Sequence, residues 1–424
     1  MDSIFRRIAD KEDNVVALTR DLIRIPTVNP PGDAYTPCAE LIGDRLGKRG
    51  FHVEYVRGEG TIGDSDAYPR TNVIARIEGN RPGPCVHFNG HIDVVEPGLG
   101  WTVDPYEGVV KDGKVYGRGS CDMKGGLAAA IVAVEALLEE HGRDFPGAIE
   151  ISGTVDEESG GYGGVAYMAE KGYFSKPRVD HVIIPEPLNV DRVCIGHRGV
   201  WWAEVETRGK IAHGSMPFLG DSAIRHMGAF LNKIEQELYP ALEKKRTTMP
   251  VVPEGAKQST LNINSFHGGL NEGFDGLPAS LVADSCRMVL DRRFLIEEDL
   301  GEVKAEVIDL LENLKANRDK FSYTIRDMME VPPTMTDENA PVVLAVAAEI
   351  LRVLGRKAET VVSPGTYDQK HIARIGHLHD CIAYGPGILD LAHQPDEYIG
   401  IEDMVNSMHV MAGATMALLN GGKV

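Results

Sequence analysis

Hydrophobic residues in the first 190 positions follow two spacings, one typical of helices and one typical of strands. Amphipathic spacing predicts helices over residues 12–25, 38–51 and 125–142. Apolar runs predict strands over residues 71–79, 84–95, 147–158 and 181–187. Strands that alternate with helices are typical of an α/β layer with a largely parallel sheet.

The pattern changes near residue 196. Residues 199–210 alternate apolar and polar side chains, as a strand does when one of its faces is exposed. Further segments of this stretch predict strands over 259–269 and 285–294, and helices over 222–238 and 297–317. We therefore expect a smaller α+β unit here.

From about Pro332 the first pattern resumes, with helices predicted over 340–355 and 401–419 and a strand over 380–387. A chain of 424 residues exceeds the size at which one hydrophobic core keeps growing. We expect two domains: an α/β domain of residues 1–196 and 330–424, with its mostly parallel sheet flanked by helices, and an inserted α+β domain of residues 197–329.

The stretch "FNGHIDVVEPG" (residues 88–98) places two polar side chains in an otherwise apolar strand. Alternate residues of a strand share a face, so His91 and Asp93 should point the same way. Alone, this pair is more typical of a surface turn or of a core histidine with its hydrogen bonds satisfied.

Four further polar segments follow candidate strands or lie in loops, where α/β enzymes carry their chemistry. Each alone has an ordinary explanation, such as a solvated charge run or a tight turn. Their candidate residues are Asp122, Glu157, Glu158, Glu186 and His393. Imidazole and carboxylate groups are the ligands of zinc and related ions. Two histidines and three carboxylates suffice for two ions if one carboxylate bridges, which leaves one of the adjacent glutamates as a base.

Charge and composition exclude several other classes. The chain has 44 Lys and Arg against 63 Asp and Glu, a net charge of -19, which argues against nucleic acid or an anionic membrane as partner. The six cysteines form no C-x-x-C pair, so neither a disulfide framework nor a thiolate zinc site is indicated. The polar N-terminus does not resemble a signal peptide. No apolar run is long enough to span a bilayer, and we expect a cytoplasmic protein.

Five blocks occur in order along the chain: "GHIDVV", "GRGSCDMKGG", "DEESGG", "EP" and "AHQPDE". Together they resemble the M20 family of metallopeptidases and deacylases, the group of acetylornithine deacetylase and succinyl-diaminopimelate desuccinylase. The resemblance runs from "IPTVNPPGD" to the C-terminal helix and so covers nearly the whole chain.

The resemblance implies a role for each candidate residue. His91 and Glu186 would bind one ion, Asp122 would bridge both, and Glu158 and His393 would bind the second. Glu157 would be the general base and acid. Asp93 would accept a hydrogen bond from the His91 ring nitrogen that the metal does not use. The resemblance also predicts a cis peptide bond between Asp122 and Met123.

The inserted domain resembles the family's lid and dimerisation domain. In "GKIAHGSMP", His213 would reach the active site of a partner subunit and stabilise the oxyanion. Arg293 in "LDRRF" and Lys370 in "GTYDQK" would bind a substrate carboxylate. Relatives have arginine where Lys370 stands, and "SLVAD" replaces their N-x-x-P-D, so these departures leave the substrate open.

The activity implied is hydrolysis of the amide bond of a small N-acyl amino acid, as in a deacetylase or desuccinylase. A dipeptidase, a carboxypeptidase or a hydrolase of another C–N bond would use the same metal ligands. A non-catalytic relative would have lost some ligands or the base, and none is lost here. We expect two divalent ions, with zinc ahead of cobalt or manganese, and a homodimer acting on a small molecule.

Overall fold

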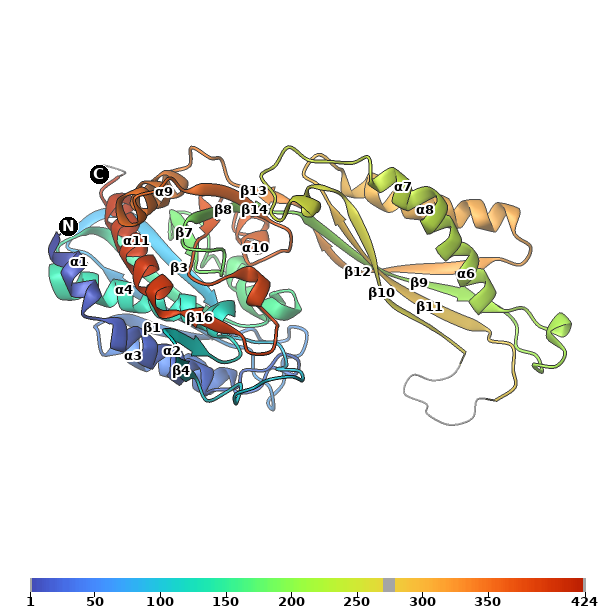
Figure 1. Cartoon of the computed structure of the whole chain (residues 1–424), viewed down its shortest axis with the longest axis horizontal. Coiled ribbons are helices and arrows are strands. Elements are labelled where there is room, and N and C mark those ends of the chain that lie inside the picture. Colours follow the sequence, from blue (N-terminus) through green and yellow to red (C-terminus); the bar gives the residue numbers. More distant parts are fainter. Residues whose placement is uncertain (1, 270–278, 422–424) are drawn as a thin grey trace. The chain divides into compact units, whose positions relative to one another are not determined.

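The structure is a computed structural model that describes residues 2–269 and 279–421 (Figure 1). The chain forms two compact units. Unit 1 comprises Met1–Gly196, Met335–Val361 and Tyr367–Val424, and unit 2 comprises His197–Thr334 and Val362–Thr366. Unit 2 is thus inserted into the chain of unit 1.

The central sheet of unit 1 has the strand order β1-β2-β6-β3-β7-β15-β8-β13, and β14 pairs with β8. Strands β6, β3, β7 and β15 run parallel, and β1 and β2 add an antiparallel edge. The strands are β1 His52–Arg57, β2 Thr71–Glu78, β3 Arg81–His91, β6 Pro146–Thr154, β7 His181–Ile184, β8 Arg192–His197, β13 Thr334–Met335, β14 Glu359–Ser363 and β15 Cys381–Ala383. The sheet and its helices confirm the predicted α/β class.

Strand β3 shows why its sequence alternates. A side chain at Gly90 would come within 3.1 Å of Leu127 on helix α4 (Gly125–His141), so this face packs closely against the helix. Asn89 points to the other face, where it donates to Asp368 at 2.9 Å and accepts from Ser152 of β6 at 2.7 Å. The apolar face of β3 therefore forms core, and the polar face leads toward His91.

The helices of unit 1 pack on this sheet and on one another. They are α1 Asp2–Ala9, α2 Glu12–Ile23, α3 Tyr35–Gly47, α4, α5 Tyr167–Glu170, α9 Pro341–Leu354, α10 Gln369–Arg374 and α11 Ile401–Leu419. Helix α4 is buried along nearly its whole length, and α11 packs against it and against α9 (Figure 1). Small alanine side chains on α4 allow this close approach. Among the described residues, no helix is long and apolar enough to cross a membrane.

A small three-stranded sheet in unit 1 joins distant parts of the chain. Its order is β16-β5-β4, formed by β4 Val109–Lys111, β5 Lys114–Tyr116 and β16 Tyr398–Gly400. Strand β5 directly precedes the Asp122 segment, and β16 directly follows the His393 segment. The pairing of Tyr398 with Tyr116 therefore brings these two segments together.

Unit 2 is an antiparallel sheet of order β10-β11-β9-β12 with helices on it, as predicted for an α+β unit. Its elements are β9 Gly199–Arg208, β10 Thr260–Gly268, β11 Ser285–Phe294, β12 Ser322–Val331, α6 Ala223–Lys233, α7 Tyr239–Leu242 and α8 Leu300–Asn317. The core between sheet and helices contains Trp201, Phe230, Leu290 and Val307.

Strand β12 was not predicted from the sequence. This strand lies at the edge of the unit 2 sheet and exposes most of its residues, including Arg326 and Glu330. Edge strands often carry charged side chains that prevent pairing with other molecules. In β12 these charged residues interrupt the alternation of apolar and polar residues by which a strand is predicted. The strand predicted over residues 380–387 is also shorter than expected and ends at Ala383.

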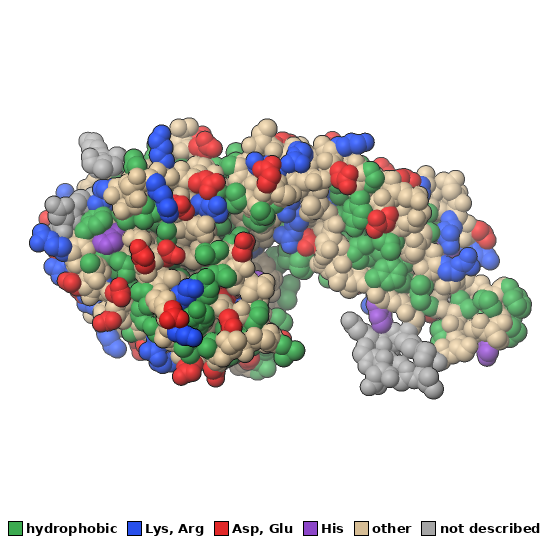
Figure 2. All heavy atoms as spheres, viewed as in Figure 1, with side chains coloured by type: hydrophobic (Ala, Val, Ile, Leu, Met, Phe, Trp, Pro, Cys, Tyr) green, Lys and Arg blue, Asp and Glu red, His purple; other side chains and the backbone are tan. Residues whose placement is uncertain are grey.

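Charged side chains of both signs are interspersed over the visible face of unit 1 (Figure 2). Several form surface ion pairs, such as Lys11 with Glu139 at 2.6 Å. The acidic excess is therefore not gathered into one patch on this face.

Candidate metal centre and active site

Four of the predicted residues, three of them candidate ligands, lie at the carboxyl ends of neighbouring parallel strands. His91 is the last residue of β3, Glu157 and Glu158 form the turn after β6, and Glu186 follows β7. Because β6, β3 and β7 are adjacent in the sheet, these ends meet at one edge.

The other two ligand candidates come from the segments joined by the small sheet. Asp122 lies in the distorted turn Ser120–Lys124 that leads into α4, and its peptide bond to Met123 is cis, which confirms that prediction. His393 lies in the loop before β16. The fold thus brings together residues that are up to 302 positions apart, from His91 to His393.

The side chains of these residues approach one another closely. His91 Nε2 lies 3.1 Å from Asp122 Oδ1, and His393 Nε2 lies 3.0 Å from Glu158 Oε1 and 3.5 Å from Asp122 Oδ2. Two groups have ligand atoms within 4.8 Å of one another: His91 with Asp122 and Glu186, and Asp122 with Glu158 and His393. Asp122 belongs to both groups.

Protonation in this cluster reflects the crowding of acidic groups. Burial and the charge of Asp122 raise the pKa of Glu186, and burial raises the pKa of Glu158 to about 7. Hydrogen bonds to Asp122 and Glu158 raise the pKa of His393 to about 10. Burial opposes the ionised form of Asp122, but hydrogen bonds from His393 and His91 keep its pKa below the ordinary value. The cluster therefore favours positive charge at its centre.

Asp93 makes different contacts from those predicted. His91 Nδ1 lies 2.9 Å from the backbone carbonyl oxygen of Asp93, whereas the Asp93 carboxylate lies 3.6 Å away. The carboxylate instead accepts the backbone N–H groups of Glu157 and Glu158, each at 3.1 Å, and the Asn29 amide at 3.0 Å. Asp93 therefore orients His91 through its backbone and the glutamate turn through its side chain.

Glu157 lies outside both groups of ligand atoms. Its Oε1 lies 2.6 Å from the Lys370 ammonium, and both side chains are nearly buried. Asp368, two residues before Lys370, is fully buried, and burial and the charge of Glu157 raise its pKa to about 7. Sequence reasoning overlooked Asp368 and Asn29, although both stand in segments, "GTYDQK" and "IPTVNPPGD", that carry the resemblance.

Residues 87–417 match the model of peptidase family M20/M25/M40. The chain belongs to this family. It is a metallohydrolase that acts on C–N bonds.

Curated relatives and a solved structure agree with this M20 assignment. The chain is 31% identical over 402 residues to a succinyl-diaminopimelate desuccinylase of Methylobacterium nodulans, covering 92% of each chain. It is 29% identical over 406 residues to the same enzyme of Methylobacterium radiotolerans, covering 92% of this chain and 93% of the relative. The structure of human carnosine dipeptidase 1 has a TM-score of 0.78 at 19% identity, covering 99% of this chain and 98% of that one, so it shares the fold.

The donor set of this M20 member fits divalent cations. Both groups combine one imidazole with two carboxylates, the ligand types of zinc and its neighbours. The raised pKa values of Glu158 and His393 point the same way, because protons balance a charge that a cation would balance.

The remaining predicted residues belong to unit 2. His213 is exposed, and its Nδ1 accepts a hydrogen bond from the Ser215 hydroxyl at 2.7 Å. Arg293 on β11 donates to both oxygens of the Asp291 carboxylate, at 2.7 and 3.0 Å. A guanidinium already paired in this way would have to exchange a partner to bind a substrate carboxylate.

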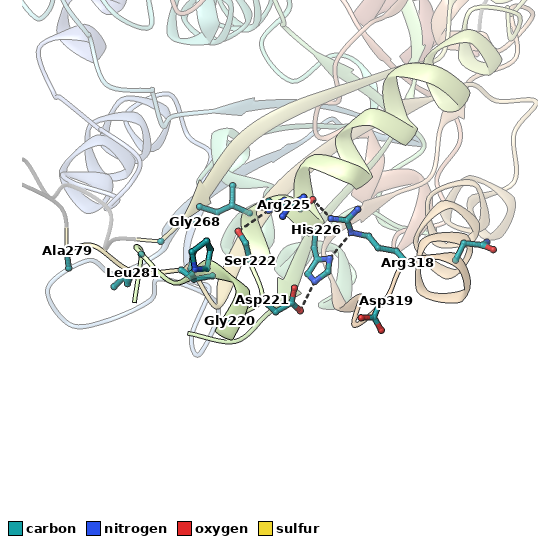
Figure 3. A pocket seen from close by; sticks show the side chains of 17 residues that line it. Gly220, Asp221, Ser222, Arg225, His226, Gly268, Ala279, Leu281, Arg318 and Asp319 are labelled. Carbon is teal, nitrogen blue, oxygen red and sulfur yellow. Dashed lines mark hydrogen bonds and ion pairs between the residues drawn. The ribbon is translucent and has the colours of Figure 1, made fainter. Parts of the chain in front are cut away.

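Unit 2 also contains a cavity of about 910 Å³ between α6 and the loops beside it (Figure 3). His226 lies in its wall, with Nε2 2.9 Å from Asp221 and Nδ1 2.9 Å from the Arg318 guanidinium that donates to it. Neither His213 nor Arg293 lines this cavity.

Proposed function

We propose that this M20 member uses two divalent cations to hydrolyse the amide bond of a small N-acyl amino acid. Zinc is the preferred cation, and cobalt and manganese are the alternatives. The observation that carries the proposal is the position of Asp122 in both groups of ligand atoms. One carboxylate shared by two sets is the arrangement that a pair of ions needs. His91 and Glu186 would complete one set, and Glu158 and His393 the other.

In this mechanism, two cations at these ligands would polarise the substrate carbonyl and lower the pKa of water toward neutrality. Glu157 is the base, because it is not in either ligand group yet belongs to the same turn as Glu158. It takes the proton of the attacking water and then delivers a proton to the departing amine nitrogen. Asp93 keeps that turn in place through the backbone N–H groups of both glutamates.

The substrate class is supported by the curated relatives, whose names describe removal of a succinyl group from an amino acid. A screen of N-acetyl, N-succinyl and N-formyl amino acids and of dipeptides, with each metal supplied in turn, tests it. We expect an N-acyl amino acid to be hydrolysed fastest. Preferential cleavage of dipeptides would show that the protein is a dipeptidase and not a deacylase. A protein that binds both ions and cleaves none of these compounds would refute the proposed hydrolysis.

A homodimer is supported by the surroundings of His213. The apolar side chains of Ile211, Phe218 and Leu219 are 56%, 79% and 54% exposed close to it in the sequence. Clustered exposed apolar side chains are typical of a surface that another protein covers. In the proposed dimer, His213 enters the active site of the partner subunit and stabilises the oxyanion.

The variant His213→Ala is expected to lower kcat by about 10²–10³-fold, the usual effect of losing an oxyanion donor. Mixing inactive His213→Ala and Glu157→Ala chains, with subunit exchange, should restore part of the activity, since each mixed dimer rebuilds one complete site. Steady-state assays of the mixture measure this. No recovery in verified mixed dimers would place His213 outside the partner's site.

Lys370 has two candidate roles, a ligand of the substrate carboxylate or a support for Glu157. The distance of 2.6 Å to Glu157 favours the second. Lys370→Met should then lower kcat by about 10²-fold with little change in KM, because the base is no longer fixed in position. Lys370→Arg, which keeps the charge, should recover much of the loss. A raised KM with unchanged kcat would instead assign Lys370 to the substrate.

A further inference from the structure

A buried carboxylate outside the predicted ligand set contacts the backbone at Asp122. Glu397 Oε1 accepts the N–H groups of Cys121 at 2.8 Å and of Asp122 at 3.1 Å. The Glu397 side chain is 0% exposed. A charged acceptor on two successive N–H groups makes strong hydrogen bonds, so Glu397 fixes the backbone from which the Asp122 carboxylate projects.

The second oxygen of Glu397 is paired with a buried arginine. Arg118 Nη1 lies 2.5 Å from Glu397 Oε2, and the Arg118 side chain is 1% exposed. Its Nη2 donates to the carbonyl oxygens of Glu96 at 3.3 Å and Pro97 at 3.1 Å, and its Nη1 also donates to that of Gln394 at 3.4 Å. The pair therefore joins the segment after His91, the Asp122 segment and the His393 segment.

The His393 segment needs such support. His393 has a φ of 63° and Asp396 a φ of 56°, in the left-handed region that residues other than glycine rarely adopt. Such backbone persists where its surroundings determine it. The His393 side chain is 47% exposed, so burial of the ring contributes little. Arg118 contacts this loop from the buried side at Gln394 and Glu397. Thr102 donates to the Asp396 carboxylate on the exposed side, at 2.8 and 2.9 Å.

Stability alone does not account for a fully buried ion pair, because the desolvation of two charges can exceed their attraction. We infer that Arg118 and Glu397 form a positioning pair that sets the placement of Asp122 against His393, and through it the cation affinity of the Asp122–Glu158–His393 group. This inference rests on the proposed two-cation function. Neither residue is a ligand, and both act through the backbone of the residues that are.

The test is the zinc affinity of the full-length Glu397→Gln variant, measured on metal-free protein by competition with a chelating dye. Glutamine keeps the size of the side chain and removes its charge. Loss of a partner that orients metal ligands typically weakens binding by about 10–100-fold. We expect at least one of the two zinc dissociation constants to rise by that factor, and the absorption spectrum of bound Co²⁺ to change.

The matched control is Glu135→Gln. Glu135 is also buried, at 1% exposed, and accepts two hydrogen bonds from Arg45 on α3, at 2.9 and 2.8 Å. The Glu135→Gln variant should have a lower melting temperature and an unchanged zinc affinity. If Glu397→Gln does not fold, Arg118→Lys serves in its place, since it keeps the charge and loses the planar set of donors.

Three outcomes decide the matter. Weaker zinc binding in Glu397→Gln but not in Glu135→Gln supports the inference. Wild-type affinity in Glu397→Gln, or an equal loss in both variants, overturns it. Wild-type protein that binds fewer than two ions would refute the proposed function itself, which separates the two failures.

Discussion

The variant Glu157→Ala is expected to lower kcat by between about 10² and 10⁴, the usual contribution of a general base, while metal content stays at the wild-type level. The reason is the separation of roles within one turn. Glu158 belongs to a group of ligand atoms, whereas Glu157 belongs to none and contacts Lys370 instead. Elemental analysis of purified protein and steady-state kinetics on the same sample measure both quantities.

The control for this variant is Glu157→Gln. Glutamine keeps the length of the side chain and an oxygen that can accept from Lys370, but it cannot take a proton from water. The two variants should therefore lose similar activity. Wild-type turnover in either variant would show that Glu157 is not the base. Loss of metal in both variants would show that Glu157 is a metal ligand.

The polar residues of the site could be predicted because they stand at strand ends or in the short blocks that carry the resemblance to the M20 family. His91 ends a strand whose alternate residues face opposite sides, and that alternation is visible in the sequence. Glu397 and Arg118 were not singled out, although both stand inside quoted blocks. Arg118 Nη1 contacts Glu397 Oε2 across 279 positions, and Glu397 Oε1 accepts the backbone N–H of Asp122 across 275 positions. Contacts between such distant positions leave no periodic signal in the sequence.

Asp93 illustrates how far the reasoning from strand geometry extends. The shared face of His91 and Asp93 correctly placed the two residues together. It could not decide between the backbone oxygen and the carboxylate of Asp93 as acceptor, because that choice depends on the turn at Glu157. The position of that turn follows from β6, a strand more than 50 residues further along.

The fold was predicted best where burial imposes a strict pattern. Helix α4, strand β6 and the second half of strand β3 are almost wholly buried, and their apolar sequences agree with the structure. Strand β12 lies at a sheet edge, and each strand of the small sheet has only three residues. Few residues of these strands are buried, so their sequences carry little of the pattern. The small sheet is nevertheless what brings Asp122 close to His393.

The variant Asp122→Ala should lose both ions, because Asp122 is the one side chain that belongs to both groups of ligand atoms among the residues described. A bound cation contributes several kcal/mol of charge stabilisation in the transition state, and each step of about 1.4 kcal/mol is tenfold in rate. Loss of both ions should therefore lower kcat by about 10⁴ or more. His91→Ala is the comparison, since His91 belongs to one group only and its loss should weaken one ion more than the other.

Metal titration of the two variants distinguishes a shared ligand from two independent sites. If Asp122 bridges, Asp122→Ala shows no high-affinity zinc, whereas His91→Ala retains binding at the group of Asp122, Glu158 and His393. Retention of one tightly bound ion in Asp122→Ala would mean that the two groups do not depend on a common carboxylate. The close distances from Asp122 to His91 and His393, 3.1 and 3.5 Å, make the first result the expected one.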